Sequence, residues 1–391
     1  MSIVDREAAN LFHTYKRIPL EIERGEGVYL YAKGGARYLD LFGGLAVNAL
    51  GYGNPRVLRA IEEQSRKYIH LSNYFLQEPQ IALAEMLIAH SGYKKVFFTN
   101  SGTESIEGTI KLARKWGATN GKQDLIAFSN AFHGRTMGAL SLMDKEKYRE
   151  GYGPFLPHCS TVGFNDVGAL KRSVNAQTAA VLLEFIQGEG GIYPVSNEFA
   201  KELDSLRKQF GFLIIADEIQ GGLGRTGKFF GFQHFNVQPD IVAIAKPLGG
   251  GLPVGAFLGN EKVAETLQPG VHGTTFGGNP VACAAGIAVL DQIVNGGLMA
   301  NAAAMGELFK TGLEALKSEF PSIIKEVRVF GLMIGVELFR DGEAIVNALR
   351  NRGVLLNCTN ANVLRFLPPL IIREPEIREG LDQLREVLRA M

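Results

Sequence analysis

The sequence predicts an α/β protein in which a mostly parallel central sheet lies between helices. Segments with strand composition alternate along the chain with segments of helical periodicity. The strand segments are also almost continuously apolar, as at residues 212–216 and 241–245. Runs of this kind indicate strands that are buried on both faces, which is typical of parallel sheets covered by helices.

The expected elements follow in chain order. A helix should begin after Asn54, because Asn is a favourable N-cap and Pro55 suits the first helical position. Its apolar residues at helical spacing continue to Tyr68 and Ile69. The next expected elements are strands at 94–99, 124–129, 179–184, 212–216 and 241–245, and helices at 103–116 and 198–209.

Beyond Asn279 the pattern changes to long helical stretches, short strands at 327–330 and 333–338, and a final amphipathic helix around Ile377 and Leu388. This part resembles a smaller α+β unit. We therefore expect a large domain at residues 51–280 and a small C-terminal domain at 281–391. Residues 1–50 are expected to pack with the small domain.

Composition and charge narrow the functional classes. The 391 residues carry a formal net charge of +1, so no overall field attracts nucleic acid or an acidic membrane. The first ten residues contain charges and no long apolar stretch, so neither a secretory signal nor a membrane anchor is expected there, and we expect a cytoplasmic protein. The three cysteines, Cys159, Cys283 and Cys358, are widely spaced and match no zinc-binding pattern, so no metal is expected.

Polar residues follow three of the apolar runs, namely Ser101, Asp217 and Lys246. In open α/β sheets the ligand crevice lies outside the carboxyl ends of the strands, so these residues become candidates for a site. Burial would lower the pKa of Lys246 and make its amine nucleophilic enough to form an imine with an aldehyde. A lysine that extends from a strand end into water is the alternative.

An acid at position 217 in the same crevice would need a cationic partner. The protonated ring nitrogen of pyridoxal phosphate is such a partner, because a carboxylate there keeps the ring an electron sink. Asp217 as a helix cap, or as a magnesium ligand in a nucleotide hydrolase, is the alternative. The second alternative is weakened because the sequence has no GxxxxGK[ST] phosphate loop.

The turn that contains Ser101 has the spacing of a capping box with Glu104 and leads into the helix expected at 103–116. The free N–H groups and positive dipole end of a helix N-terminus bind phosphate well. A purely structural cap is the alternative. Combined with Lys246 and Asp217, the turn predicts a place for the phosphate of the cofactor.

Residues 222–227 (GLGRTG) fit the dinucleotide fingerprint GxGxxG, which would indicate a nicotinamide-dependent dehydrogenase. The fingerprint should open a helix directly after a strand. Here residues 217–221 intervene, and residues 227–235 are aromatic and irregular. We therefore keep a dehydrogenase only as a remote alternative.

Several ordered motifs resemble those of the class III, fold type I pyridoxal-phosphate aminotransferases, closest to the acetylornithine aminotransferase group. The resemblance runs essentially from end to end. The motifs stand at residues 24–27 (RGEG), 45–51 (LAVNALG), 72–73 (SN), 100–105 (NSGTES), 132–136 (FHGRT), 187–191 (QGEGG), 217–220 (DEIQ) and 272–280 (HGTTFGGNP).

The resemblance implies roles for the residues around the cofactor. Lys246 would carry pyridoxal phosphate as a Schiff base and move a proton during catalysis, and Asp217 would pair with the ring nitrogen. Gln220 would hydrogen-bond the ring hydroxyl, and Phe132 would stack on the ring, although a core aromatic is the reading from sequence alone. The phosphate cradle would consist of Gly102 and Thr103, completed by Thr275 from the other subunit of a homodimer.

The resemblance also implies two substrate arginines. Arg135 would hold the carboxylate of an acylated ornithine, since its planar fork suits bidentate pairing, although taken alone a surface arginine is the simpler reading. Arg365 would bind the α-carboxylate of glutamate, and Glu189 would cover Arg365 when the other amino donor is bound. Such cover is needed because an unpaired charge in a closed site is costly.

This sequence departs from the family at three places, with Phe185 where proline is usual, Pro247 where glycine is common and Thr274 where serine is frequent. None of these removes a catalytic group. Thr274 falls in the region that would bind the acyl group, so the choice between acetyl and succinyl stays open.

The resemblance thus implies transfer of the terminal amino group of an acylated ornithine to 2-oxoglutarate, in arginine biosynthesis. Transamination of ornithine, 4-aminobutyrate or a carrier-bound lysine is the alternative within the family. A binding protein that keeps the fold without turnover is a further alternative.

Overall fold

The computed structural model describes residues 2–391, and its largest sheet has seven strands in the order β4-β12-β11-β10-β7-β5-β6. Every neighbouring pair is parallel except those made by β12, which runs antiparallel to both β11 and β4. The mostly parallel sheet expected from the sequence is therefore confirmed. The strands are β4 (Lys95–Thr99), β5 (Asp124–Phe128), β6 (Cys159–Val162), β7 (Thr178–Leu183), β10 (Leu213–Asp217), β11 (Ile241–Ile244) and β12 (Gly255–Gly259).

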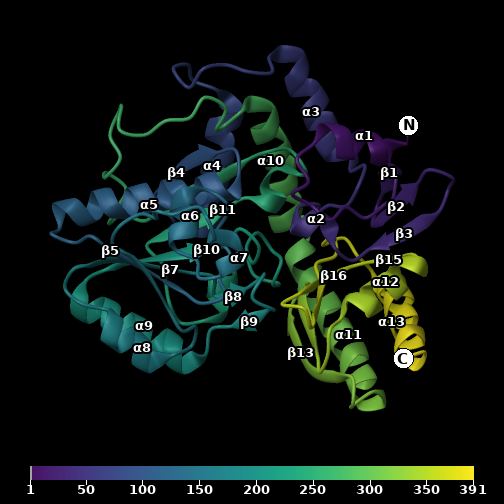
Figure 1. The fold of residues 1–391 in the computed structure, drawn as a ribbon. Helices are drawn as coiled ribbons and strands as arrows, with labels where there is room; N and C mark the ends of the chain where they lie inside the picture. The colour runs from purple at the N-terminus through teal and green to yellow at the C-terminus, as the bar shows by residue number, and fades with distance from the viewer. Residues whose placement is uncertain (1) are drawn as a thin grey trace.

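The central strands are buried on both faces, as their apolar runs predict. Every residue of β7, β10 and β11 is buried. Successive side chains of β10 enter different cores, because side chains alternate across a sheet. Leu213 and Ile215 pack in the core that includes α5 (Gly102–Thr119), whereas Ile214 packs in the core that includes α9 (Asn197–Phe210). Figure 1 shows α5 on one side of this sheet and α8 (Val167–Ser173) with α9 on the other.

The helix expected after Asn54 is α3 (Pro55–Lys67), and the Asn54 side chain accepts hydrogen bonds from the N–H groups of Arg56 and Val57 at 3.0 and 3.3 Å. The expected continuation to Ile69 is wrong. Tyr68 is extended, with φ of −167°, so the helix ends at Lys67 despite the apolar spacing.

Two smaller four-stranded sheets lie beside the large one. One has the order β1-β2-β3-β15 and joins the two ends of the chain, because β3 pairs in parallel with β15. The other has the order β13-β14-β17-β16. Figure 1 shows the purple N-terminal strands next to the yellow C-terminal helices. The bounds are β1 (Ile22–Glu26), β2 (Tyr29–Ala32), β3 (Arg37–Asp40), β13 (Ile324–Phe330), β14 (Met333–Leu338), β15 (Val354–Leu355), β16 (Asn357–Thr359) and β17 (Val363–Phe366).

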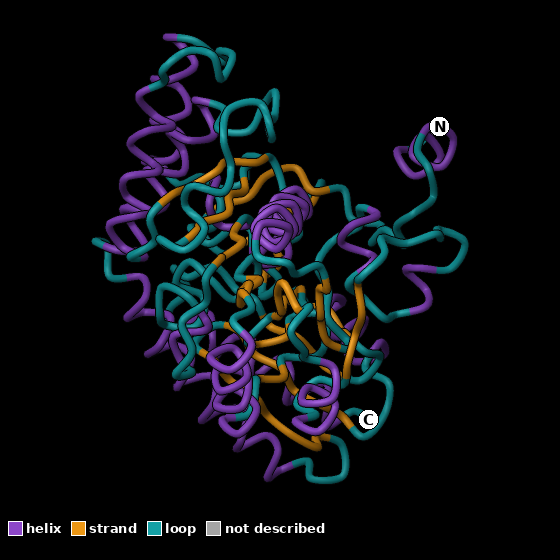
Figure 2. Tube along the Cα trace, turned by 90° about the vertical axis from the view of Figure 1, so that its left-hand side faces the viewer, coloured by secondary structure: helices purple, strands orange, loops and turns teal. Residues whose placement is uncertain are grey.

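The remaining elements connect and cover these sheets. Helix α10 packs on α3 and α4, while α11 packs on β13 and α13. Figure 2 shows α1 standing apart from the body of the chain, and none of its residues is buried. The bounds are α1 (Ile3–Asn10), α2 (Gly43–Ala46), α4 (Glu78–Ser91), α6 (Met137–Ser141), α7 (Glu146–Arg149), β8 (Ile186–Gln187), β9 (Tyr193–Pro194), η1 (Gly231–His234), η2 (Lys246–Gly249), α10 (Pro280–Val294), α11 (Leu298–Glu319), α12 (Glu343–Asn351) and α13 (Glu374–Arg389).

Within residues 2–391, no single helix is long and apolar enough to cross a membrane. Helices α10 and α11 reach the required length and hydropathy only as a pair bent by 59°.

Candidate active site

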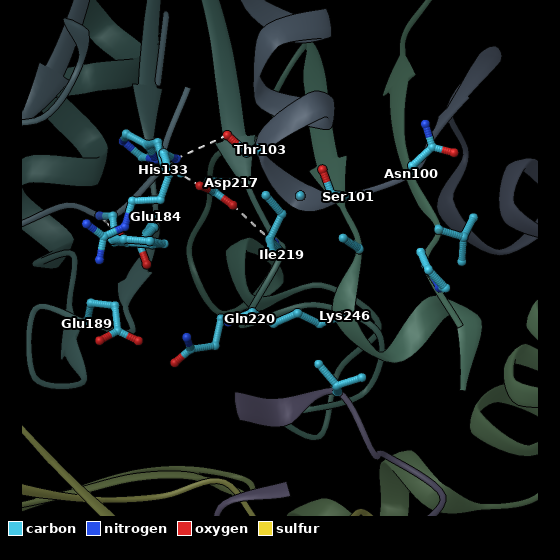
Figure 3. Close-up of a pocket in the computed structure, with 18 of the residues that line it drawn as sticks. Asn100, Ser101, Thr103, His133, Glu184, Glu189, Asp217, Ile219, Gln220 and Lys246 are labelled. Atoms are coloured by element: carbon cyan, nitrogen blue, oxygen red, sulfur yellow. Dashed lines mark hydrogen bonds and ion pairs between the residues drawn. The ribbon is translucent and has the colours of Figure 1, made fainter. Parts of the chain in front are cut away.

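A cavity of about 420 Å³ opens at the carboxyl ends of β4, β10 and β11. These strands run in the same direction, so the residues that end them meet at one edge of the sheet (Figure 3). Ser101, Asp217 and Lys246 all line this cavity. Six other residues expected at the site also line it, namely Gly102, Thr103, Phe132, Arg135, Glu189 and Gln220.

Asp217 is the last residue of β10 and is only 6% exposed. One of its carboxylate oxygens lies 2.8 Å from Nδ1 of the buried His133, and the other accepts a hydrogen bond from the N–H of Ile219 at 3.1 Å. Nε2 of His133 has no hydrogen-bond partner within residues 2–391. The carboxylate is thus fixed in orientation by two donors on elements that meet at the cavity.

Lys246 is the first residue of η2 and faces the cavity directly after β11. Burial, helped by the nearby charge of Arg365, lowers the pKa of its amine to about 8. Its φ of +39° is in the left-handed region, which costs a residue with a side chain about 1–3 kcal/mol and is concentrated at functional sites. The amine is therefore both held in position and easily deprotonated near neutral pH.

Ser101 is the N-cap of α5, where its Oγ accepts a hydrogen bond from the N–H of Glu104 at 3.3 Å. The expected capping box is only half formed, because the Glu104 side chain does not accept a hydrogen bond from the N–H of Ser101. The Glu104 carboxylate accepts from both the main-chain N–H and the side-chain amide of Asn100, each at 2.8 Å. Within the described chain, no hydrogen bond uses the N–H groups of Gly102 and Thr103, which leaves the helix N-terminus open to an anion.

Close packing leaves little space around the N-terminus of α5. A Cβ on Gly102 would lie 2.9 Å from Cγ2 of Ile219. A Cβ on Gly134 would lie 2.2 Å from Oγ1 of Thr103, the oxygen that also accepts a hydrogen bond from the N–H of Arg135 at 3.2 Å. The loop that carries Arg135 is therefore tied directly to the first turn of α5. The guanidinium carbon of Arg135 lies 4.0 Å from the ring centre of Tyr148.

Arg365 lies on β17 and is fully buried. Its Nη1 is 2.5 Å from a carboxylate oxygen of Glu189 and 3.2 Å from Oε1 of Gln220, while Nη2 has no partner within residues 2–391. Burial alone would raise the pKa of Glu189, but the charge and hydrogen bond of Arg365 outweigh it, so the pKa is lowered. Arg365 is not among the residues that line the cavity, and it reaches the site through Glu189 and Gln220.

Two side chains at the site, those of Glu184 and His133, were missed in the sequence. Glu184 follows β7 and accepts hydrogen bonds from the N–H groups of Phe132 and Gly188 at 3.0 and 2.9 Å. Burial, with the charge of Asp217, raises the pKa of Glu184 to about 7. An acid at the end of an apolar run is the signal that could have found it. His133 has no comparable signal, because it lies in a loop and contacts Asp217 across 84 positions of sequence.

Thr274 and Thr275 do not line the cavity. Both lie on a separate hollow that also contains His70 and Asn73. Thr274 approaches the site only through its Oγ1, which lies 3.3 Å from the side-chain amide of Asn100.

Residues 222–227 form turns rather than the start of an α-helix, so the context of a dinucleotide fingerprint is absent from this part of the described chain. Arg225 within it is buried and donates to the carbonyl of Leu332 at 3.1 Å. Among residues 2–391, no group of three or more His, Cys, Asp or Glu side chains is arranged to hold a metal ion.

The cavity fits pyridoxal phosphate on its own geometry. It combines a buried carboxylate, a lysine amine of lowered pKa and a helix N-terminus with unused N–H groups. These are the groups that a ring nitrogen, an aldehyde and a phosphate require. The fold and site therefore define a pyridoxal-phosphate enzyme.

Comparison with known proteins gives the family. A family model described as aminotransferase class-III matches residues 12–388. The acetylornithine aminotransferase of Aquifex aeolicus is 43% identical, with 97% of this chain and 99% of that protein covered. That of Caldanaerobacter subterraneus is 44% identical, with 99% of each covered.

Solved structures agree. The ornithine aminotransferase from Toxoplasma gondii matches with a TM-score of 0.95 at 31% identity, covering 99% of this chain and 94% of that one. The acetylornithine aminotransferase from Elizabethkingia anophelis matches with a TM-score of 0.89 at 33% identity, covering 100% and 98%. This chain belongs to the class-III aminotransferases, which depend on pyridoxal phosphate. The predicted family, fold and cofactor are thereby confirmed.

Proposed function

We propose that this chain transfers the terminal amino group of N-acetylornithine to 2-oxoglutarate, giving the semialdehyde and glutamate, as a step of arginine biosynthesis. The observation that carries the proposal is the ion pair of the buried Arg365 with the partly buried Glu189, beside the amine of Lys246. A cation that the protein itself can neutralise suits an enzyme whose two amino donors differ in charge. The relatives named acetylornithine aminotransferase support the choice of donor.

For the cofactor, we propose that Gly102 and Thr103 bind the phosphate, Phe132 covers the ring, Gln220 binds the ring hydroxyl and Asp217 binds the ring nitrogen. Their common position on one cavity supports these roles. Pyridoxal phosphate, when bound, supplies an electron sink for the substrate carbon and carries the amino group between the two half-reactions.

In the chemistry, Lys246 is proposed to take a proton from the substrate carbon and return it. Its pKa of about 8 leaves a useful fraction of the amine deprotonated near neutral pH, which a general base needs. Asp217 is proposed to present its carboxylate to the ring nitrogen in a fixed orientation, and its hydrogen bond with His133 supports that role.

For the substrates, Arg135 is proposed to bind the carboxylate of N-acetylornithine at the exposed rim of the site. Arg365 is proposed to bind the α-carboxylate of glutamate and of 2-oxoglutarate. Glu189 would neutralise Arg365 while N-acetylornithine is bound and release it when a dicarboxylate enters. Thr274 is proposed to lie near the acyl group.

We propose a cytoplasmic homodimer with the active site at the subunit interface, where Thr275 of one subunit completes the phosphate site of the other. Large apolar side chains are exposed in the segments that flank the hollow containing Thr275, namely Ile69 (64%), Tyr74 (97%), Phe75 (64%), Leu76 (92%) and Phe276 (59%). Several large apolar side chains exposed in neighbouring segments are typical of a protein interface. Sedimentation at several concentrations tests the dimer, and a monomer that retains full activity would refute it.

The division into residues 51–280, 281–391 and an N-terminal segment that packs with the latter also remains a proposal. The pairing of β3 with β15 supports the last part. Hydrogen exchange followed by mass spectrometry tests the division, since residues 1–50 should gain and lose protection together with residues 281–391.

The decisive experiment is single-turnover bleaching of the cofactor absorbance by N-acetylornithine, N-succinylornithine, ornithine and 4-aminobutyrate. N-acetylornithine should react fastest, and equal rates for all four donors would refute the proposed substrate. Borohydride reduction followed by peptide mapping should place the cofactor on Lys246. Bound cofactor that no amine bleaches would instead indicate a binding protein without turnover.

A further inference from the structure

The proposed function leaves one partner unassigned, and the inference below rests on that function. When a dicarboxylate occupies Arg365, the carboxylate of Glu189 loses its ion-pair partner. Glu189 retains only 23% of its side-chain exposure, so an unpaired charge there is costly. A second cation close to Glu189 would therefore favour the conformer in which the Glu189 carboxylate has left Arg365.

Glu189 lines a second hollow, of about 420 Å³, on the side of the site that faces α7. Three cations lower the pKa of the Glu189 carboxyl, namely Arg365, Lys246 and Lys145. Lys246 lines the cavity where substrate would lie, and Arg365 reaches that cavity through Glu189. Lys145 lines the second hollow together with Glu189.

Lys145 is half-buried, and no carboxylate of the described chain forms an ion pair with it. Its Nζ donates a hydrogen bond to the side-chain oxygen of Asn360 at 2.7 Å. Burial lowers the pKa of Lys145, and the charge of Glu189 acts in the opposite direction. A partly buried cation bound only to a neutral amide is poised to accept an anion.

The backbone at Glu189 is held by the same turn that holds Lys145. Thr359 Oγ1 donates to the carbonyl of Glu189 at 2.6 Å, and the side-chain amide of Asn360 donates to the carbonyl of Gly190. These two hydrogen bonds hold the main chain at Glu189 and Gly190, so a change of partner would fall to the Glu189 side chain. Glu189 lines both the cavity and the hollow that contains Lys145, so rotation of its side chain could move the carboxylate from one to the other.

We propose that Lys145 is a specificity-determining residue that receives the Glu189 carboxylate when a dicarboxylate substrate binds Arg365. Lys145 then stabilises the open state and has no role in binding the acylated donor. It favours the glutamate and 2-oxoglutarate half-reaction alone.

The test measures each half-reaction separately by stopped-flow bleaching or recovery of the cofactor absorbance in the dimeric holoenzyme. Lys145→Gln keeps a hydrogen-bond donor toward Asn360 and removes the charge. It should raise the apparent dissociation constants of glutamate and 2-oxoglutarate about two- to five-fold, the range of a partly exposed ion pair, and leave N-acetylornithine unchanged. Lys145→Arg should restore the wild-type values. Lys201→Gln removes an exposed lysine charge from α9, away from both the cavity and the hollow, and is the matched control that should change neither half-reaction.

A double-variant cycle separates electrostatic pairing from simple bracing of the turn. In a Glu189→Gln background there is no carboxylate at position 189 with which Lys145 could pair. Lys145→Gln should therefore have no further effect there. The same loss in both backgrounds, or equal losses with N-acetylornithine and glutamate, would overturn the proposal. A wild-type enzyme that does not react with glutamate would overturn the proposed function as well, whereas a normal wild type with an unaffected Lys145→Gln variant overturns this inference alone.

Discussion

Glu189→Gln tests the exchange of partners on Arg365 directly. In the wild type the carboxylate lies 2.5 Å from a guanidinium nitrogen of a fully buried arginine. Glutamine is nearly the same size and keeps an acceptor oxygen, but it cannot neutralise Arg365. With N-acetylornithine bound, Arg365 would then carry an uncompensated charge in the variant. With glutamate bound, the substrate carboxylate would meet no competing anion.

The structure sets the size of the effect. A hydrogen bond to a charged group contributes about 1.5–3 kcal/mol, and the retained amide oxygen recovers part of it. We expect a loss of about 10- to 30-fold in kcat/KM for N-acetylornithine. Reaction with glutamate should be equal to or faster than that of the wild type, so the ratio of the two specificity constants moves toward glutamate.

Stopped-flow measurement of the two half-reactions, with each donor varied under single-turnover conditions, gives both constants from one preparation. Far-ultraviolet circular dichroism and the cofactor spectrum serve as controls for folding and loading. Equal losses for the two donors would refute the reasoning, because they would show that Glu189 supports the site without discriminating between substrates.

Three further predictions follow from the same contacts. Arg135→Ala should weaken binding of N-acetylornithine more than binding of glutamate, and Arg365→Ala should do the reverse. Equal increases in the steady-state KM of both donors would contradict the assignment of one arginine to each substrate. Gly102→Ala should weaken binding of pyridoxal phosphate about 5- to 150-fold in an absorbance titration, because the new Cβ would lie 2.9 Å from Ile219 at the phosphate end; an unchanged affinity would place the phosphate elsewhere. Burial raises the pKa of Glu218 to about 8, above its unfolded value of 4.5, so its effect on stability is absent below about pH 4.5 and destabilising as pH rises to 8, by at most about 5 kcal/mol. Glu218→Gln should therefore flatten the fall in melting temperature between pH 5 and 8, and an unchanged slope would argue against a buried proton there.

The rule that placed Ser101, Asp217 and Lys246 together needed only local sequence. Continuous apolar runs mark buried strands, and parallel strands present their carboxyl ends at one edge. The same rule would have found Glu184, which follows β7 in the same way. It could not reveal His133, because a loop residue gives no periodic signal.

Strand β12 was also missed, since its sequence, GAFLG, is short and bounded by glycines that weaken a strand pattern. Its position between β4 and β11 is determined by tertiary packing and not by local sequence. The contact between Glu189 and Arg365 spans 176 positions of sequence, and no local pattern encodes it. The family resemblance supplied that pair, and the structure shows that the two side chains meet.

The position of Arg365 on β17 has a consequence for substrate length. Lys246 is fixed at the end of β11 in the large sheet, whereas Arg365 is fixed in a different, smaller sheet. A substrate that reaches both must span the gap between the two sheets. The relative position of the two sheets therefore limits the length of a substrate that contacts both residues, and substitutions far from the cavity that shift one sheet relative to the other would change which amino acids fit.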